Sequence, residues 1–188
     1  MIRLITGSAD PRHQDLLEEH YRLRHEIFVG ERGWAAIARP DGREVDAYDT
    51  PQTVYVLALD DGYVVGGYRF LPTNAPHLLQ DRFSHLVDGP VPRGREIHEW
   101  SRFFIRKDHR GGRLFRQLIG SVPGACKLLG IASLTSVIEP DWLSRFDAAN
   151  FRYQLLGPFI ETAGMHLAAA QIDIQQAPAP GLAIGWDS

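Results

Sequence analysis

The stretch from Arg24 to Asp49 reads RHEIFVGERGWAAIARPDGREVDAYD and combines a cation, two large aromatic rings and a pair of carboxylates. It is too polar and too rich in glycine to be core alone. Phe28 continues a helical apolar period, but Trp34 follows GERG outside any period. Asp46 and Asp49 stand three residues apart. We therefore take these side chains as candidates for a binding site rather than for packing only.

A second set of candidate residues surrounds the turn RKDHRGG, between a predicted strand that ends at FFI and a predicted helix. Free backbone N–H groups from Arg110 to Arg113 at a helix N-terminus attract anions, and Gly111 and Gly112 let a ligand approach the backbone. Arg106, Lys107 and Arg116 add charge. The loop suits the phosphates of coenzyme A, or the phosphopantetheine and acidic surface of an acyl carrier protein. A solvated helix start with ordinary surface arginines is an equally good interpretation.

Local patterns predict the elements that position these residues. Strands are expected at 2–6, 53–59, 63–71, 98–105, 131–138, 151–157 and 166–174, with a tight DDG hairpin turn between the second and the third. A helix is expected over 11–29, with Asp10 as N-cap and Pro11 at the first helical position. Further helices follow RKDHRGG, ending or kinking at Pro123, and begin at Pro140. Strands interleaved with helices favour an α/β sandwich around a mixed sheet.

Composition limits the classes of function. The chain has 188 residues and a formal charge of -3, so it carries no general attraction for nucleic acid. Its one cysteine, Cys126, cannot form an internal disulfide, and no apolar run is long enough for a signal peptide or a membrane span. We expect a cytoplasmic protein with one domain over residues 1–175 and a loose tail over 176–188. The eight histidines show no metal-ligand spacing.

Taken together, these residues resemble the LuxI-type acyl-homoserine lactone synthases. The chain matches the order and spacing of that pattern over roughly residues 20 to 175, with Arg24-x3-Phe28-x5-Trp34, Asp46-x2-Asp49, Arg69 and Glu99-x-Ser101-Arg102-Phe103. The loop at Arg110 to Arg113 is similar to the pyrophosphate-binding turn of GNAT acyltransferases, although its second glycine is adjacent rather than one residue on. The resemblance implies a GNAT-like three-layer α/β/α fold around a twisted mixed sheet.

The resemblance also implies a reaction. S-adenosylmethionine is acylated by an acyl thioester, a lactone closes, and methylthioadenosine leaves, with no metal and no tightly bound cofactor. The cosubstrate amine has a pKa of roughly 7.7 to 8 and needs a base. Glu99 is the candidate base, acting directly or through a water, with Ser101 and Arg102 beside it. The S-adenosylmethionine site is expected at Arg24, Phe28, Trp34, Asp46, Asp49 and Arg69, where the aromatic faces would attract the sulfonium.

Several of these residues have structural interpretations that remain open. Arg69 and Arg102, with Arg24 and the aspartates, are equally suited to a buried ion-pair network that only positions the N-terminal segment. Phe28 is equally suited to the core of its helix. Ser101 alternates with Glu99 along a strand and would orient the base. Phe103 is expected to line an acyl channel rather than to take part in catalysis.

The acyl-donor site is expected at Phe103, Phe104, Arg110, Gly111, Gly112, Arg113, Trp142 and Phe146. Family members that make 3-oxo signals commonly place a threonine where alignment through Arg145 puts Glu139, which has no hydroxyl to donate. If Trp142 points into a tunnel with Phe104 and Phe146, the space is short and aromatic. A short, branched or aromatic acyl group on coenzyme A follows, although Trp142 packed in the core is at least as good an interpretation.

Two other functions compete. A generic GNAT N-acyltransferase that uses acetyl-CoA would share the fold and the loop, but it would not need Arg24, Phe28, Trp34 or the aspartate pair. A non-catalytic acyl-ligand sensor would carry a DNA-binding helix-turn-helix and a basic domain, and neither is found in the sequence. The expected partners are small-molecule substrates and, as one option, an acyl carrier protein. The sequence leaves the acyl chain, its carrier and the oligomeric state open.

Overall fold

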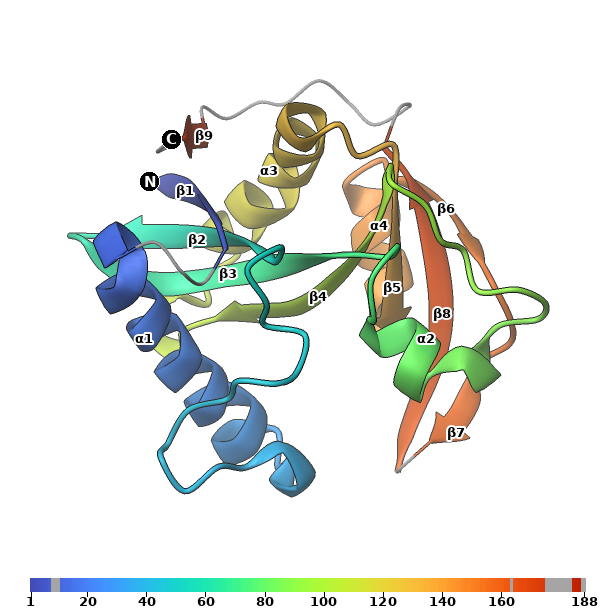
Figure 1. Ribbon diagram of the computed structural model, residues 1–188, viewed down its shortest axis with the longest axis horizontal. Coiled ribbons are helices and arrows are strands. Elements are labelled where there is room, and N and C mark those ends of the chain that lie inside the picture. Colours follow the sequence, from blue (N-terminus) through green and yellow to red (C-terminus); the bar gives the residue numbers. More distant parts are fainter. Residues whose placement is uncertain (8–10, 163, 175–183, 187–188) are drawn as a thin grey trace. The chain divides into compact units, whose positions relative to one another are not determined.

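The computed structural model describes residues 1–7, 11–162, 164–174 and 184–186 (Figure 1). The backbone divides into two compact units. The first comprises Met1–Arg69, Arg102–Ile119 and Ala183–Ser188, and the second comprises Phe70–Ser101 and Gly120–Leu182. Strands β3 (Tyr63–Pro72) and β4 (Ile97–Ile105) each run from one unit into the other. The single domain expected over residues 1–175 stays a prediction.

The first unit contains the strand order β4-β3-β2-β1-β9, in which β1 is Ile2–Thr6, β2 is Val54–Asp60 and β9 is Ile184–Trp186. β1 pairs antiparallel with β2 and parallel with β9, so the sheet is mixed, as predicted. The hairpin between β2 and β3 turns at Asp61 and Gly62, whose φ angles are 48° and 88°. Positive φ at both central residues gives the backbone twist that two-residue hairpins need.

The first helical segment is confirmed and longer than expected. A 3₁₀ turn at Pro11–His13 leads into α1, Gln14–Arg24, which continues as a π-helix over His25–Glu31, and a further 3₁₀ turn follows at Ala35–Ile37. Apolar residues of α1 and the π-helix pack with β1, β2 and β3 in a core that includes Ile5, Leu17, Phe28, Leu57 and Phe104. The expected N-cap, Asp10, lies outside the described residues.

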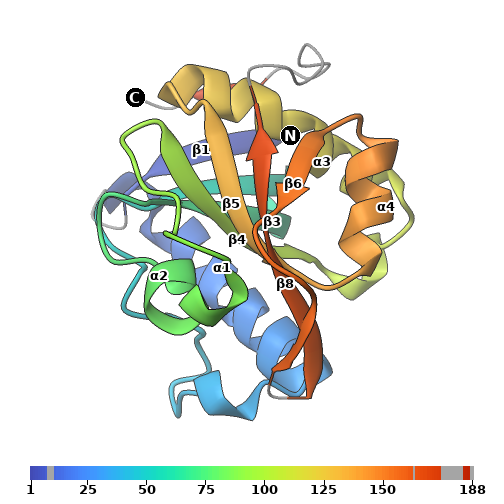
Figure 2. The ribbon, with the colours of Figure 1, turned by 90° about the vertical axis from the view of Figure 1, so that its right-hand side faces the viewer.

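The second unit contains the strand order β6-β8-β5-β4-β3 (Figure 2). Its strands are β5 (Ser133–Ile138), β6 (Arg152–Leu155), β7 (Ile160–Thr162) and β8 (Met165–Asp173). β5 runs parallel to β4 and antiparallel to β8. Helix α4, Asp141–Ala148, begins after Pro140 as predicted. Helix α2, Leu78–Arg82, and a 3₁₀ turn at Ser84–Leu86 were not predicted, because both are too short to show a period.

Two expectations differ at least in part from the structure. Helix α3 spans Arg113–Leu129 and contains Pro123, so the proline does not end it, and the alternative that it kinks the helix stays a prediction. The buried side chains of Leu118, Val122, Ala125 and Cys126 anchor the helix on both sides of the proline and offset its missing N–H. Part of the predicted loose tail forms strand β9. No helix in the described ranges is long and apolar enough to cross a membrane.

Candidate active site

Six charged side chains of the first unit form a closed ring of alternating charge, which we call the ion-pair ring: Arg24, Glu44, Arg102, Asp46, Arg69 and Asp49. Arg24 makes a bidentate pair with Asp49, with distances of 2.9 Å and 3.0 Å from the two Nη atoms to the carboxylate oxygens. Its Nε atom donates to Glu44. One buried guanidinium therefore joins two carboxylates from the loop that follows the helical segment.

The other two arginines close the ring. Arg102 donates to both carboxylate oxygens of Glu44 at 3.0 Å and to Asp46 at 3.1 Å. Arg69 makes a bidentate pair with Asp46, at 2.8 Å and 2.7 Å, and contacts Asp49 at 2.8 Å. Three positive and three negative groups thus balance, which is the condition under which charges tolerate burial.

Glu44 is the ring member that sequence reasoning missed. It lies two residues before Asp46 in EVDAYD, so its place in an acidic cluster was a usable signal. Burial alone would raise the pKa of Glu44, but the positive charges of Arg24 and Arg102 outweigh that effect and lower its pKa below the usual value. Burial would likewise raise the pKa of Asp49, but the positive charges of Arg24 and Arg69 outweigh that effect and hold its pKa well below the ordinary range. Both groups are therefore carboxylates at neutral pH.

The ring has an open side and a buried side. The Asp46 side chain is 20% exposed and that of Arg102 is 10% exposed. The other four side chains are at most 1% exposed: Arg24, Glu44, Asp49 and Arg69. In this structure only Asp46 and Arg102 are therefore placed to touch a ligand directly, and the buried four hold them in position.

Backbone geometry places the ring members. Arg24 ends α1, Arg69 lies in β3, and Arg102 lies in β4 with a φ of 55°. A positive φ is rare for a residue with a side chain, and here it accompanies the contacts of Arg102 with two carboxylates. The Asp46 backbone N–H donates to Asp49 at 2.9 Å, which stabilises the loop that carries both aspartates.

The Asp49 carboxylate also accepts a hydrogen bond from a tyrosine, which the sequence did not predict. The Tyr55 hydroxyl donates to Asp49 at 3.0 Å and lies 2.9 Å from the Tyr21 hydroxyl. His20 is fully buried beside both tyrosines, with ring centroids 5.4 Å and 5.2 Å away. Burial, and then the charge of Arg24, lower the pKa of His20 well below its usual value, so the imidazole is neutral.

Phe28 and Trp34 form a stacked pair, with centroids 5.0 Å apart and planes inclined by 17°. Phe28 is 2% exposed and belongs to the core, whereas Trp34 is partly buried against it. The Arg102 guanidinium lies 5.6 Å from the Phe28 ring and 5.9 Å from the Trp34 ring. The structural and the functional interpretations of Phe28 are therefore compatible, because one ring packs the core and also borders the open side of the ion-pair ring.

The candidate base lies in the second unit. The Glu99 side chain is buried, and its Oε2 atom accepts a hydrogen bond of 2.9 Å from the backbone N–H of Leu79, in the first turn of α2. This bond satisfies a helix N–H that has no partner within the helix and fixes the orientation of the carboxylate. Ser101 is partly buried two residues further along β4.

The loop before α3 differs in part from the predicted anion site. The N–H of Arg110 donates to Lys107 at 3.4 Å and that of Gly111 donates to His109 at 3.0 Å, so the prediction that both are free is wrong. The Arg110 side chain pairs with Glu31 at 2.6 Å, while Arg113 and Gly112 are exposed at the start of α3. The backbone carbonyls of Lys107 and His109, both in the 3₁₀ turn Lys107–His109, accept these two hydrogen bonds.

The predicted acyl-site rings fall into separate groups. Phe103 stacks on Tyr68, with centroids 6.2 Å apart. Phe104 packs on Phe28 and His20 in the core of the first unit, with centroids 6.4 Å and 5.3 Å away, so its contacts do not support a tunnel role.

In the second unit, aromatic rings from β4, α4 and the residue before β6 form one cluster. Trp142 packs edge-on against Trp100 at 5.8 Å and lies 5.7 Å from Phe146. Phe146 is fully buried and also contacts Phe151 at 6.2 Å. Trp142 is therefore packed between helix and sheet, and it is only partly buried there.

Comparisons with known proteins identify the family to which the chain belongs. The model of the autoinducer synthase family matches residues 9–129. The isovaleryl-homoserine lactone synthase of Bradyrhizobium diazoefficiens is 43% identical over 178 residues, covering 94% of this chain and 81% of that protein. The acyl-homoserine-lactone synthase of Ralstonia nicotianae is 35% identical over 188 residues, covering 95% of this chain and 91% of that protein.

Solved structures of an acyl-homoserine lactone synthase and of another acyltransferase are also similar to this chain. The CoA-dependent acyl-homoserine lactone synthase BjaI, solved with SAM and isopentyl-CoA, has a TM-score of 0.92 at 40% identity and covers 100% of this chain and 93% of its own. An acyl-CoA N-acyltransferase from Pseudomonas aeruginosa, at 15% identity, shares the fold with a TM-score of 0.64 and covers 91% and 97%. The chain therefore belongs to the autoinducer synthase family and is an acyltransferase of the acyl-homoserine-lactone synthase type on a GNAT-like α/β fold.

Proposed function

We propose that this enzyme acylates the amine of S-adenosylmethionine with a short acyl group carried by coenzyme A. The thioester C–S bond breaks as the amide forms, and the substrate carboxylate then displaces methylthioadenosine to close the lactone. The observation that carries the proposal is the open side of the ion-pair ring. It presents one carboxylate, Asp46, and one guanidinium, Arg102, beside the stacked rings of Phe28 and Trp34.

These groups match the charges of the cosubstrate. Asp46 complements the ammonium group, and Arg102 complements the carboxylate through a planar, charge-assisted contact. The aromatic faces of Phe28 and Trp34 attract a sulfonium, which has no hydrogen-bond donors, with roughly 0.5 to 2 kcal/mol per contact. The buried ring members act through these two charges as positioning residues: Arg24, Glu44, Asp49 and Arg69.

Glu99 is proposed as the general base. The amine, with a pKa of roughly 7.7 to 8, is mostly protonated at neutral pH and cannot attack a thioester in that form. A carboxylate that is held by the Leu79 N–H has the fixed orientation that proton transfer requires. Ser101 lies two residues further along the same strand, and its hydroxyl is proposed to orient the Glu99 carboxylate.

Lactone closure needs no acid catalyst from the protein, because the leaving group is a neutral thioether that does not have to be protonated. Arg102 is proposed to hold the carboxylate of the acylated intermediate near its own γ-carbon. Holding two reacting groups together in one molecule supplies much of the rate enhancement in such steps.

The donor site is proposed at the start of α3, where exposed Gly112 and Arg113 meet the N-terminal end of a 17-residue helix. Helix N-termini and arginine side chains favour phosphate groups. Coenzyme A is preferred over an acyl carrier protein because the similar structure BjaI is described as CoA-dependent. The proposed setting for these small-molecule substrates is the cytoplasm.

The acyl group is proposed to be short and branched or aromatic, without a 3-oxo group. Trp142 and Phe146 pack with Trp100 and present aromatic surface that fills space. Glu139, between β5 and α4, has no hydroxyl to donate to a 3-oxo oxygen. The relative named isovaleryl-homoserine lactone synthase supports the same size class.

The proposal is tested by incubating the enzyme with S-adenosylmethionine and a matched panel of acyl groups, each on coenzyme A and on acyl carrier protein. Mass spectrometry would quantify methylthioadenosine and each lactone. We expect the highest kcat/KM for a branched acyl-CoA of the isovaleryl type. A preference for long 3-oxo chains on carrier protein would overturn the donor and chain assignments, and release of an acylated amine without a lactone would overturn the reaction itself.

The role of Glu99 is tested by Glu99→Gln. The amide oxygen of glutamine still accepts from the Leu79 N–H, so Tm should be unchanged, whereas loss of the base should lower kcat by roughly 100-fold or more. The control is Glu96→Gln, at an exposed position just before the same strand. Wild-type turnover in Glu99→Gln would remove Glu99 from the mechanism.

A further inference from the structure

A row of polar side chains crosses the sheet of the second unit from Glu99 to the edge strand. Glu99 on β4 is in register with Thr135 on β5, Thr135 with Gln171 on β8, and Gln171 with Gln154 on β6. Residues directly opposite one another in a sheet project to the same face. We call these four residues the polar row, and it begins at the candidate base.

Contacts of α2 identify the face that carries the row. The Leu79 N–H donates to Glu99, and the Leu79 side chain packs in one cluster with Val137. Val137 lies two residues beyond Thr135 on β5 and therefore projects to the same face. The Glu99 carboxylate and the Thr135 hydroxyl thus occupy neighbouring strands on the face that α2 contacts.

The Thr135 hydroxyl is unusual in its surroundings. The residue is 0% exposed, and its Oγ1 atom has no hydrogen-bond partner among the described residues. A buried hydroxyl without a partner disfavours folding relative to a valine of the same shape. The Thr135 hydroxyl therefore has no evident role in stability, although Thr135 is in register with the one carboxylate that the reaction is proposed to protonate.

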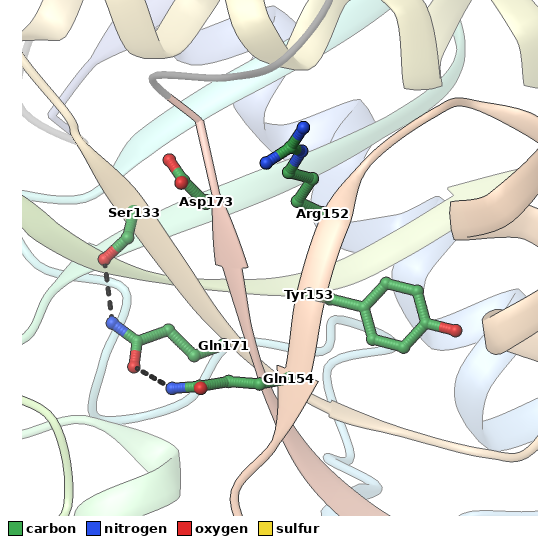
Figure 3. Close-up of a pocket in the computed structure, with 6 residues that line it drawn as sticks. All are labelled: Ser133, Arg152, Tyr153, Gln154, Gln171 and Asp173. Carbon is green, nitrogen blue, oxygen red and sulfur yellow. Dashed lines mark hydrogen bonds between the residues drawn. The ribbon is translucent and has the colours of Figure 1, made fainter.

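The far half of the row borders solvent. Figure 3 shows the residues that line a pocket in the second unit: Ser133, Arg152, Tyr153, Gln154, Gln171 and Asp173. The volume of this pocket is about 360 Å³. The Gln171 amide donates to the Ser133 hydroxyl at 3.1 Å and accepts from the Gln154 amide at 3.4 Å. Ser133 precedes Thr135 by two residues on the same face of β5, and Gln171 is the cross-strand neighbour of Thr135. The pocket carries polar side chains that can bind water, and it is roomy enough to hold it.

We propose that the polar row carries the proton of the reaction from Glu99 to solvent. This inference rests on the proposed role of Glu99 as the base. The substrate ammonium gives one proton to the Glu99 carboxylate. In the described part of the chain Thr135 Oγ1 has no partner, so the Thr135 side chain must first turn to bring Oγ1 within hydrogen-bond distance of Glu99 and of water in the pocket beside Ser133 and Gln171. The resulting acid then donates its proton to Thr135 Oγ1, while the Thr135 hydroxyl passes its own proton to that water. Glu99 returns to a carboxylate, Thr135 is unchanged, and the solution gains one proton.

Other titratable and charged groups lie near the row. Asp81 belongs to α2, and Arg152 and Asp173 line the pocket. His98 precedes Glu99 on β4 and projects to the other face. His77, just before α2, is the alternative to Thr135 as acceptor of the proton from Glu99. Its Nδ1 atom bonds with the Ala75 carbonyl at 3.0 Å. Its Nε2 atom is buried without a hydrogen-bond partner in the described structure.

The test compares Thr135→Val, which replaces the hydroxyl with a methyl group of similar size, with Thr135→Ser, which retains the hydroxyl and loses the methyl group. We expect Thr135→Val to lower kcat by roughly tenfold or more, with the KM of both substrates unchanged and Tm equal to or above that of the wild type. Imidazole, a small proton carrier, should restore the rate as its concentration rises. Thr135→Ser should keep the wild-type kcat without imidazole. Glu99→Gln and His77→Gln are measured in parallel.

The outcomes of these measurements distinguish the polar row from a structural role of Thr135 and from a route through His77. Wild-type kcat in Thr135→Val, together with an inactive Glu99→Gln, would overturn the row while leaving the base in place. A lowered Tm with a loss of activity that neither serine nor imidazole restores would show a structural role and also overturn the row. If His77→Gln alone becomes dependent on imidazole, the proton leaves through His77 instead. Full activity of Glu99→Gln would overturn the proposed base and the row together.

Discussion

At the scale of single residues, Glu44 decides the charge balance of the ion-pair ring. Its carboxylate holds both Arg24 and Arg102 and is 1% exposed. We predict that Glu44→Gln lowers the free energy of unfolding by about 3 kcal/mol, because a buried arginine would lose a charged partner. Urea denaturation would measure the change. Asp41→Asn removes the exposed carboxylate that pairs with Arg43 and should leave stability unchanged; equal losses in the two variants would contradict a special role for Glu44.

Trp142 is the residue at which the acyl preference can be tested. It is partly buried, and it packs on Trp100 and Phe146. We predict that Trp142→Ala shifts kcat/KM toward longer acyl chains, because removing the indole opens space beside the cluster. The measurement is a series of unbranched acyl-CoA donors of increasing length. Tyr63→Ala, at an exposed ring, is the control, and an unchanged chain-length profile in Trp142→Ala would exclude the indole from specificity.

At the scale of elements, the start of α3 contains two arginines in different situations. Arg113 is exposed at the helix start, whereas Arg110 pairs with Glu31 at the end of the π-helix that contains Phe28. We predict that Arg113→Glu raises the KM for acyl-CoA and leaves the KM for S-adenosylmethionine nearly unchanged. Arg110→Glu should change both values, because it also repels Glu31.

Steady-state kinetics with each substrate varied in turn would measure these effects. Lys127→Glu, at an exposed position near the other end of α3, serves as the control for a change of charge on the same helix. If Arg113→Glu raised both KM values equally, the start of α3 would not be the donor site.

The segment between the π-helix and the ion-pair ring is predicted to order over the bound cosubstrate. Over about residues 28–48 the glycines and charged residues of the sequence leave few apolar anchors. In the structure, Trp34, Ile37 and Val45 pack on the core, while most residues from 35 to 41 are exposed. Hydrogen exchange should therefore slow mainly over 29–43 when S-adenosylmethionine is added. Equal protection with and without it would contradict the prediction.

At the scale of the whole molecule, buried histidines predict how stability depends on pH. Burial lowers the pKa values of His20, His77 and His98 from the usual value of about 6.5. Below pH 6.5 the unfolded chain therefore binds more protons than the folded one. The sign follows from linkage: this contribution to stability is complete above about pH 6.5 and is lost as the pH falls toward the folded pKa values.

Thermal unfolding between pH 5 and pH 8 would measure this effect. We expect Tm to fall below about pH 6.5 in the wild type and to fall less steeply in His20→Leu, because leucine cannot take up a proton in the unfolded chain. Parallel curves for the two proteins would show that His20 does not contribute. The depressed pKa values of Glu44 and Asp49 affect stability only in more acid solution, below about pH 4.5. The carboxylates therefore do not contribute to the change in Tm between pH 5 and pH 8.

Local patterns in the sequence determined most of the elements and the family. The β-branched runs gave β2, β3 and β5, the DDG turn gave the hairpin, and Pro140 marked the start of α4. These signals work because side-chain periodicity and turn chemistry act over a few neighbouring residues. Elements without a period were missed, among them α2 and β7. The alternative that Pro123 ends its helix was wrong, because the burial of the surrounding helix outweighs one lost hydrogen bond.

The order of Arg24, Asp46, Asp49, Arg69 and Arg102 in the chain was enough to identify candidate residues, but only the tertiary structure decided what each one does. Arg102 and Glu44 are 58 residues apart in sequence, and their contact depends on the backbone of β4 and on the path of the loop before β2. The same is true of the Leu79 bond to Glu99 and of the unpartnered Thr135 hydroxyl, which follow from strand register. The physical reason is that residue type fixes charge and shape, whereas burial and partners arise only when distant segments pack together.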